Sequence, residues 1–203
     1  MVNTINYLKE TPSQTAGPYV HIGMVPNFCD ITGVIAEDLG KAMIGDGTKG
    51  ERITITGRVL DGAGNPVNDC VVEIWQADAN GIYNSPAEHR SGADENFAGW
   101  GRCPADKDGV FRFDTIKPGQ VPGPNGAPMA PHVSLWIVAR GINIGLLTRM
   151  YFSDEAEANA KDPILARVRP SGREHTLIGK REGDTVTFDI RLQGEEETVF
   201  LDA

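Results

Sequence analysis

Short segments that alternate apolar and polar residues, separated by glycine and proline, constrain the fold of this chain most strongly. The segments "ERITITGRVLD", "DGVFRFDTIKP" and "HVSLWIVARG" place hydrophobic side chains at every second position, which is the period of a strand with one buried face. Stretches such as "DGAGNPV" and "GQVPGPNGAPMAP" lie between such segments and are typical of turns and loops. About eight strands at this spacing predict an all-β fold, an antiparallel β-sandwich.

The rest of the chain predicts long connections and little helix. Residues 1–50 lack sustained periodicity and predict an N-terminal arm and loop, with a turn or two of helix over 36–43. Residues 84–105 predict a long irregular loop, which is a candidate for function. "DEAEANAKDPILARV" predicts one short helix, because acids at its start suit a helix N-terminus. We expect one domain, with the sandwich over 51–203.

Composition and charge exclude several classes of protein. The 203 residues carry a net charge of -9, whereas nucleic-acid binding requires a basic face. The three cysteines, Cys29, Cys70 and Cys103, are odd in number and widely spaced, so we expect reduced thiols and a cytoplasmic protein. The N-terminal segment lacks the apolar core of a secretory signal, and no apolar run reaches the roughly 20 residues of a membrane span.

Two residues, His132 and Tyr83, are candidate metal ligands by type and position. In "APHVSLW", His132 and Ser134 lie two apart on a strand, about 6 to 7 Å from each other on one face. A His-x-His pair at that spacing could hold a metal, but this chain has His-x-Ser. His132 is therefore either a hydrogen-bonded histidine of the core or a ligand. Tyr83 follows a strand and a turn glycine, and is either a packed loop residue or a tyrosinate that binds a ferric ion.

The segments "EIWQADANGIY", "GWGRCPADKDGVFRFDTIKPG" and "PMAPHVS", in this order, resemble the intradiol ring-cleaving dioxygenases over nearly the whole chain. The resemblance implies the sandwich fold and a non-haem ferric ion held by two tyrosines and two histidines. The matching positions are Tyr83, Val121, His132 and Ser134. Valine offers no donor atom and neutral serine replaces imidazole poorly, so we expect these positions to be relics that bind no metal in this chain.

The resemblance further implies that this chain is the metal-free alpha subunit of a hetero-oligomer whose beta subunit has the same fold and binds the Fe(3+). That enzyme would use O2 to cleave protocatechuate to 3-carboxy-cis,cis-muconate. The arm would pack on the beta subunit, and the resemblance places Thr15, Gly17, Pro18, Tyr19 and Arg140 in its substrate pocket. For Arg140, a salt bridge within the sheet or between subunits is the alternative.

Two rival functions follow from the same residues. An autonomous iron-dependent dioxygenase would need replacement ligands, for which Tyr19 or His21 are available. A binding or structural sandwich without an enzyme partner would need no metal at all. Iron content of the chain alone separates the first rival from the favoured interpretation.

Overall fold

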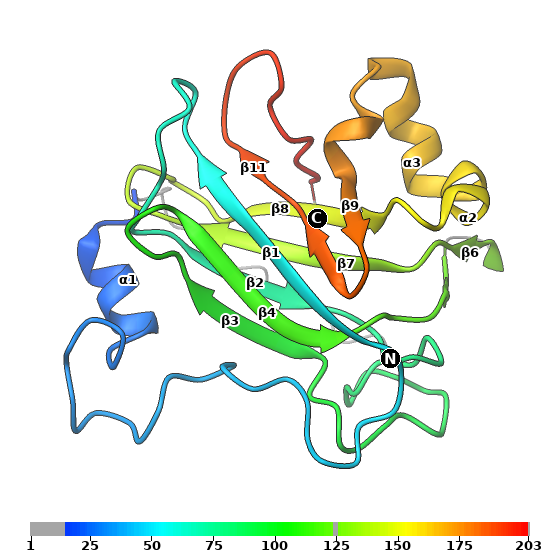
Figure 1. Cartoon of the computed structure of the whole chain (residues 1–203), viewed down its shortest axis with the longest axis horizontal. Helices are drawn as coiled ribbons and strands as arrows, with labels where there is room; N and C mark the ends of the chain where they lie inside the picture. Colours follow the sequence, from blue (N-terminus) through cyan, green and yellow to red (C-terminus); the bar gives the residue numbers. More distant parts are fainter. Residues whose placement is uncertain (1–14, 124–125, 203) are drawn as a thin grey trace, which may run out of the picture.

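Two layers of strands form the body of the structure, which is a computed structural model that describes residues 15–123 and 126–202 (Figure 1). The first layer contains β1 (Arg52–Leu60), β4 (Val110–Ile116), β10 (Thr185–Thr187) and β11 (Ile190–Arg191). The second contains β2 (Val71–Trp75), β3 (Trp100–Pro104), β7 (His132–Val138) and β8 (Leu146–Phe152). β9 (Ile178–Glu182) pairs with β10 and with β8, and so links the layers.

The predicted β-sandwich is confirmed, although its sheet is mixed rather than purely antiparallel. β1 pairs in parallel with β10 and β11, and β8 pairs in parallel with β9. The remaining strand pairs are antiparallel, including the central β2–β7 and β7–β8 ladders. A separate pair, β5 (Val121–Pro122) and β6 (Pro128–Met129), lies before β7. These two ladders and this pair position the candidate site described below.

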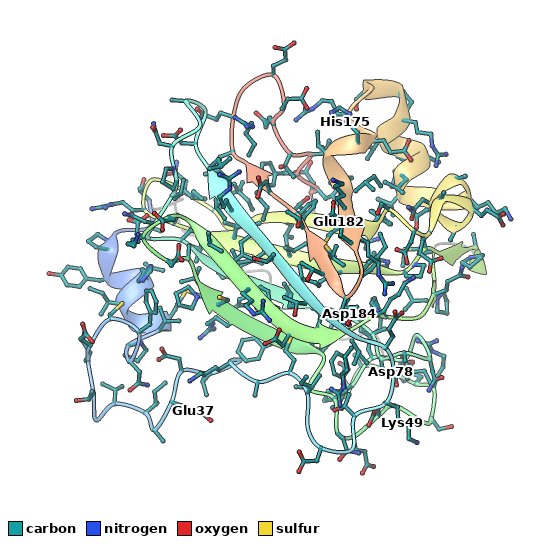
Figure 2. The ribbon with its side chains drawn as sticks, viewed as in Figure 1. Glu37, Lys49, Asp78, His175, Glu182 and Asp184 are labelled. Atoms are coloured by element: carbon teal, nitrogen blue, oxygen red, sulfur yellow. The ribbon has the colours of Figure 1, made fainter. Side chains whose placement is uncertain are left out.

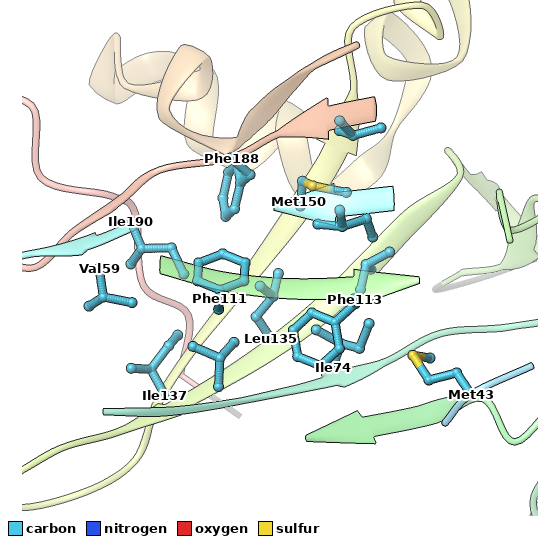
Figure 3. Close-up of a cluster of buried hydrophobic side chains, with 14 of the residues drawn as sticks. Met43, Val59, Ile74, Phe111, Phe113, Leu135, Ile137, Met150, Phe188 and Ile190 are labelled. Atoms are coloured by element: carbon cyan, nitrogen blue, oxygen red, sulfur yellow. The ribbon is translucent and has the colours of Figure 1, made fainter. Parts of the chain in front are cut away.

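The hydrophobic core fills the space between the two layers. Phe111 and Phe113 of β4 face Ile74 of β2 and Leu135 of β7, and all four side chains are almost completely buried (Figure 3). Each strand contributes the alternate positions that the sequence pattern marks as apolar. The core thus holds β7 and β8 rigidly, and with them the polar residues on their other face.

Helices are more numerous than predicted. α1 (Pro18–Met24) lies in a part of the arm where no helix was expected, and proline at its first position has the backbone angle that starts a helix. The single helix expected after β8 is divided into α2 (Ala156–Lys161) and α3 (Pro163–Val168). Asp162 between them has extended backbone angles because a proline follows it.

Two further predictions for connecting segments are wrong. Residues 36–43 form bends and a turn rather than helix, and the Asp38 carboxylate accepts hydrogen bonds from the backbone N–H groups of Asn27 and Phe28. The irregular loop expected over 84–105 ends in strand β3, which pairs with β2 from Val71 to Trp75. Within the two described stretches of the chain, no helix combines the length and the apolarity needed to cross a bilayer.

Candidate functional site

Asp78 fixes the loop that carries Tyr83. Its buried carboxylate accepts hydrogen bonds from the backbone N–H groups of Asn80 at 2.8 Å, Ile82 at 2.9 Å and Asp94 at 3.0 Å, and Figure 2 labels it at the base of this loop. The Tyr83 ring then stacks on Trp75, with centroids 5.8 Å apart and ring planes within 2°. Tyr83 is therefore held as an ordered, half-buried side chain at the end of β2.

The loop that leads to Val121 packs backbone to backbone against the Tyr83 loop. The N–H of Gly119 donates to the carbonyl of Asp78 at 2.9 Å. A side chain at Gly81, whose φ is +76°, would overlap the carbonyl of Gln120. The two glycines bring the Tyr83 and Val121 segments together, as the resemblance requires, but the buried Val121 side chain offers no ligand atom there.

His132 is buried at the start of β7, with 4% of its surface exposed. Its Nδ1–H donates to the carbonyl of Ala130 at 2.8 Å, which leaves the unprotonated Nε2 buried and without a hydrogen bond to any described residue. The Tyr151 ring lies 5.7 Å away on β8, opposite His132 in the ladder. His132 is thus a fixed, neutral imidazole with one unused nitrogen.

Arg149 lies close to the segments that carry the four relic positions. On β8 it faces Ser134 across the β7–β8 ladder, and its Nη1 contacts Sδ of Met129 at 3.3 Å. Met129 in turn pairs with Val121 across β5 and β6. Burial lowers the pKa of His132 and raises the pKa of Tyr83, and the positive charge of Arg149 adds to the first shift and opposes the second. The guanidinium therefore lies within electrostatic reach of both remaining candidate ligands.

These residues do not fit a ferric ion. Two of the four positions carry no suitable donor, and burial raises the pKa of the Tyr83 phenol, which opposes formation of a tyrosinate. The Arg149 cation would also repel a metal ion at this place. Over the described part of the chain, no cluster of three or more His, Cys, Asp and Glu side chains is arranged to hold a metal.

The buried His132 predicts a pH dependence of stability. Burial, assisted by the charge of Arg149, lowers the pKa of His132 from 6.5 to about 4. The unfolded chain binds this proton more readily than the folded chain does. The contribution of neutral His132 to the free energy of unfolding is therefore fully present above pH 6.5 and is lost as pH falls toward 4, by about 1.4 kcal/mol for each pH unit. We expect His132→Gln to flatten the dependence of the unfolding free energy on pH, as measured by urea unfolding between pH 4 and 7.

The exposed His89 provides the matched control for that experiment. We expect His89→Gln to leave the slope of the unfolding free energy against pH unchanged. An equal slope in His132→Gln and the parent chain would contradict the assignment of a buried neutral imidazole.

A second group of candidate residues gathers at the opposite end of β7. The backbone N–H of Ala16 donates to the carbonyl of Ile142 at 3.1 Å, and the N–H of Gly141 donates to the carbonyl of Ala16 at 3.1 Å. The Thr15 hydroxyl donates to Oδ1 of Asn143 at 2.5 Å. The structure thus joins the "TAGPYV" segment to the "VARGIN" loop, two stretches that lie far apart in the sequence.

Arg140 extends from this junction into solvent. Its Nε lies 2.9 Å from the buried Oδ2 of Asp69, at ion-pair distance but without hydrogen-bond geometry, while 62% of the arginine side chain remains exposed. The Asp69 carbonyl also accepts a hydrogen bond from Nδ1 of His21 on α1 at 2.8 Å. The salt bridge considered from the sequence is present, and it leaves the outer guanidinium nitrogens available to an anion.

Sequence reasoning placed Tyr83, His132 and Arg140 as candidates and missed Arg149 and Asp69. A signal for Arg149 was available, because a cation in the apolar strand "LLTRMYF" needs a partner or a purpose. Asp69 precedes the strand "VVEIW" in a turn, and only the folded chain brings it next to Arg140. The assignment of Thr15, Gly17, Pro18, Tyr19 and Arg140 to a substrate pocket stays a prediction.

Comparisons with known proteins identify relatives of this chain. A family model described as "Dioxygenase" (Dioxygenase_C) matches residues 24–194. The protocatechuate 3,4-dioxygenase alpha chain of Pseudomonas putida is 45% identical over 203 residues, covering 98% of each chain. The beta chain of that name from Burkholderia cepacia is 38% identical, covering 82% of this chain and 75% of its own. The solved intradiol ring-cleavage dioxygenase from Tetranychus urticae, 21% identical, has a TM-score of 0.55 and covers 78% of this chain and 89% of its own.

Proposed function

The chain belongs to the intradiol ring-cleavage dioxygenase family, and on that basis we propose that it is the metal-free alpha subunit of a protocatechuate 3,4-dioxygenase. Its beta partner, of the same fold, would bind the ferric ion and cleave protocatechuate with O2 to 3-carboxy-cis,cis-muconate. The observation that carries the proposal is the loss of two ligand positions, Val121 and Ser134, in a fold that keeps the other two.

The Arg149 guanidinium strengthens this proposal beyond the missing ligands. A site that had lost two ligands by drift would still leave room for a metal, whereas here a cation lies among the remaining positions. The iron of the enzyme would therefore be held by the partner. The partner's ferric ion supplies the redox chemistry of ring cleavage, and this chain supplies shape and charge at the edge of that pocket.

The arm supports assembly with a partner. Its described residues expose an unusual number of large apolar side chains, among them Tyr19 at 83%, Val34 at 65% and Leu39 at 58%. Isolated exposed apolar residues need no explanation, but a group of them within one segment is typical of a protein interface. The root of the arm is anchored to its own sandwich by Val25, which packs on Val71 and Val138. We propose that the exposed face of the arm packs on the beta subunit.

The junction of the arm with Arg140 supports a role in the substrate pocket of that partner. Thr15, Gly17, Pro18 and Tyr19 lie beside the loop that carries Arg140, because the backbone of Ala16 pairs with that loop. An arm that reaches the partner would bring the exposed guanidinium with it. A fork-shaped cation suits the carboxylate of protocatechuate.

Iron content and ring-cleaving activity test the proposal. The full chain purified alone is expected to contain no stoichiometric iron and to leave protocatechuate uncleaved. The complex formed by co-expression with a His-x-His paralogue is expected to contain one iron per alpha–beta pair and to be active. The matched control is the paralogue expressed alone, which should carry iron.

Either of two results would contradict the proposal. Stoichiometric iron with turnover in the isolated chain would favour an autonomous dioxygenase with ligands such as Tyr19 or His21. A stable iron-free chain that forms no complex with the paralogue would favour a binding or structural sandwich.

A further inference from the structure

A cavity of about 620 Å³ opens beside the relic positions and includes one of them, Ser134, but the proposed function assigns no ligand to it. Its floor is formed by Ser134 of β7 and by β8. One wall is α3, and the opposite wall is the C-terminal segment, which is held against β8 by a hydrogen bond from the N–H of Leu201 to the carbonyl of Leu147 at 2.8 Å. A cavity of this size accommodates a small organic molecule.

The lining of the cavity is mostly apolar but contains two arginines. The apolar residues come from all three sides and comprise Leu147, Ile164, Val168, Phe200 and Leu201. The charged residues are Arg149 from β8, Arg167 from α3 and Asp202 near the chain end. Hydrophobic walls with a few charged groups are the usual composition of a small-molecule site.

Both arginines lack an anionic partner among residues 15–123 and 126–202. Neither forms a salt bridge, although the chain carries a net charge of -9 and most of its other arginines pair with a carboxylate. In these residues the Arg149 guanidinium contacts two neutral groups, the weak acceptor Sδ of Met129 and the Tyr151 hydroxyl. Two guanidinium groups at one cavity therefore offer charge-assisted hydrogen bonds that the chain itself does not use.

From this arrangement we propose that the cavity is a non-catalytic binding site for a small organic carboxylate with an apolar body. Arg149, on the floor, and Arg167, on the wall, would hold the carboxylate, and the apolar residues would cover the remainder of the molecule. The Ser134 hydroxyl lies at the same floor and can donate to the anion. Inorganic phosphate fits less well, because it would leave the apolar walls uncovered.

Calorimetric titration of the full chain with benzoate tests the proposal. We expect saturable binding of one benzoate per chain, weakened at least tenfold in both Arg149→Met and Arg167→Met. Arg167 is exposed, so we expect the Arg167→Met variant to fold. It therefore tests the proposal even if Arg149→Met does not fold. Asp202→Asn is expected to tighten binding by about twofold to fivefold, because it removes an exposed like charge at the same cavity.

Matched probes and variants make the outcome decisive. Arg191→Met removes another arginine that has no salt bridge in the described residues but lies outside this cavity, and it should leave benzoate affinity unchanged. The neutral isostere benzamide and inorganic phosphate should each bind at least tenfold more weakly than benzoate. Equal affinity for benzamide, or unchanged affinity in the Arg149 and Arg167 variants, would overturn the proposal. So would loss of benzoate binding on assembly with the beta subunit, since a partner group would then occupy the cavity.

Discussion

Replacement of Arg140 by alanine is expected to lower kcat/KM for protocatechuate by about tenfold to a hundredfold in the assembled enzyme, while the iron content stays the same. This corresponds to the roughly 1.5 to 3 kcal/mol that a hydrogen bond to a charged group contributes. The reason is geometric, because Asp69 holds Nε at 2.9 Å while 62% of the side chain faces outward beside the arm. A loss expressed mainly in KM would indicate that the cation binds substrate and transition state equally.

Arg58 provides a closely matched control for this experiment. It is also an arginine with an exposed side chain, and its Nη2 lies 2.9 Å from Oδ2 of Asp189, but it is on β1, far along the chain from the arm junction. We expect Arg58→Ala to leave the kinetics unchanged. Arg140→Lys should recover part of the activity, because lysine keeps the positive charge. It should not recover all of it, because lysine lacks the planar guanidinium that binds a carboxylate through two nitrogens. Unchanged kinetics in an intact complex with Arg140→Ala would show that its ion pair with Asp69 is purely structural.

The fold was predictable where the pattern of side chains alone decides the structure. β1, β4 and β7 each alternate buried and less buried residues as the sequence does. β3 escaped prediction because "WGRCP" contains glycine and proline, and it becomes a strand only by pairing with β2. α1 escaped because it buries none of its residues in the chain itself, so no apolar face marked it. For β3 the missing information is therefore long-range pairing rather than local propensity.

The candidate site was predictable in its residue types and not in its electrostatics. The resemblance located Tyr83, Val121, His132 and Ser134, and the two glycine-rich loops bring the first two segments together as expected. Arg149 belongs to none of those motifs. Its position depends on the register of β7 against β8, which places it opposite Ser134. A shift of one residue would have turned it into the core, so the register could be read only from the folded chain.

The second large effect is expected at Asp162, which joins the site to the helices. The residue is fully buried. Its Oδ1 accepts from the backbone N–H groups of Ile164 and Leu165 at 2.8 and 2.9 Å and from the Tyr151 hydroxyl at 3.2 Å. Its Oδ2 accepts from the N–H of Ala130 at 2.9 Å. One carboxylate thereby starts α3, the wall of the cavity, and fixes the segment that leads into β7.

Asp162→Ala is expected to lower the free energy of unfolding by about 3 to 5 kcal/mol, since it removes a helix cap and leaves buried donors without an acceptor. In thermal unfolding each kcal/mol should lower Tm by roughly 2 to 4 °C in a chain of this size. Asp162→Asn keeps the shape and one acceptor but directs an amide N–H at that of Ala130, so we expect an intermediate loss. Glu157→Ala, at an exposed acid of α2, should change stability by less than about 0.5 kcal/mol. A loss as small as that in Asp162→Ala would mean that water replaces the carboxylate, and that α3 is anchored by apolar packing of Leu165 alone.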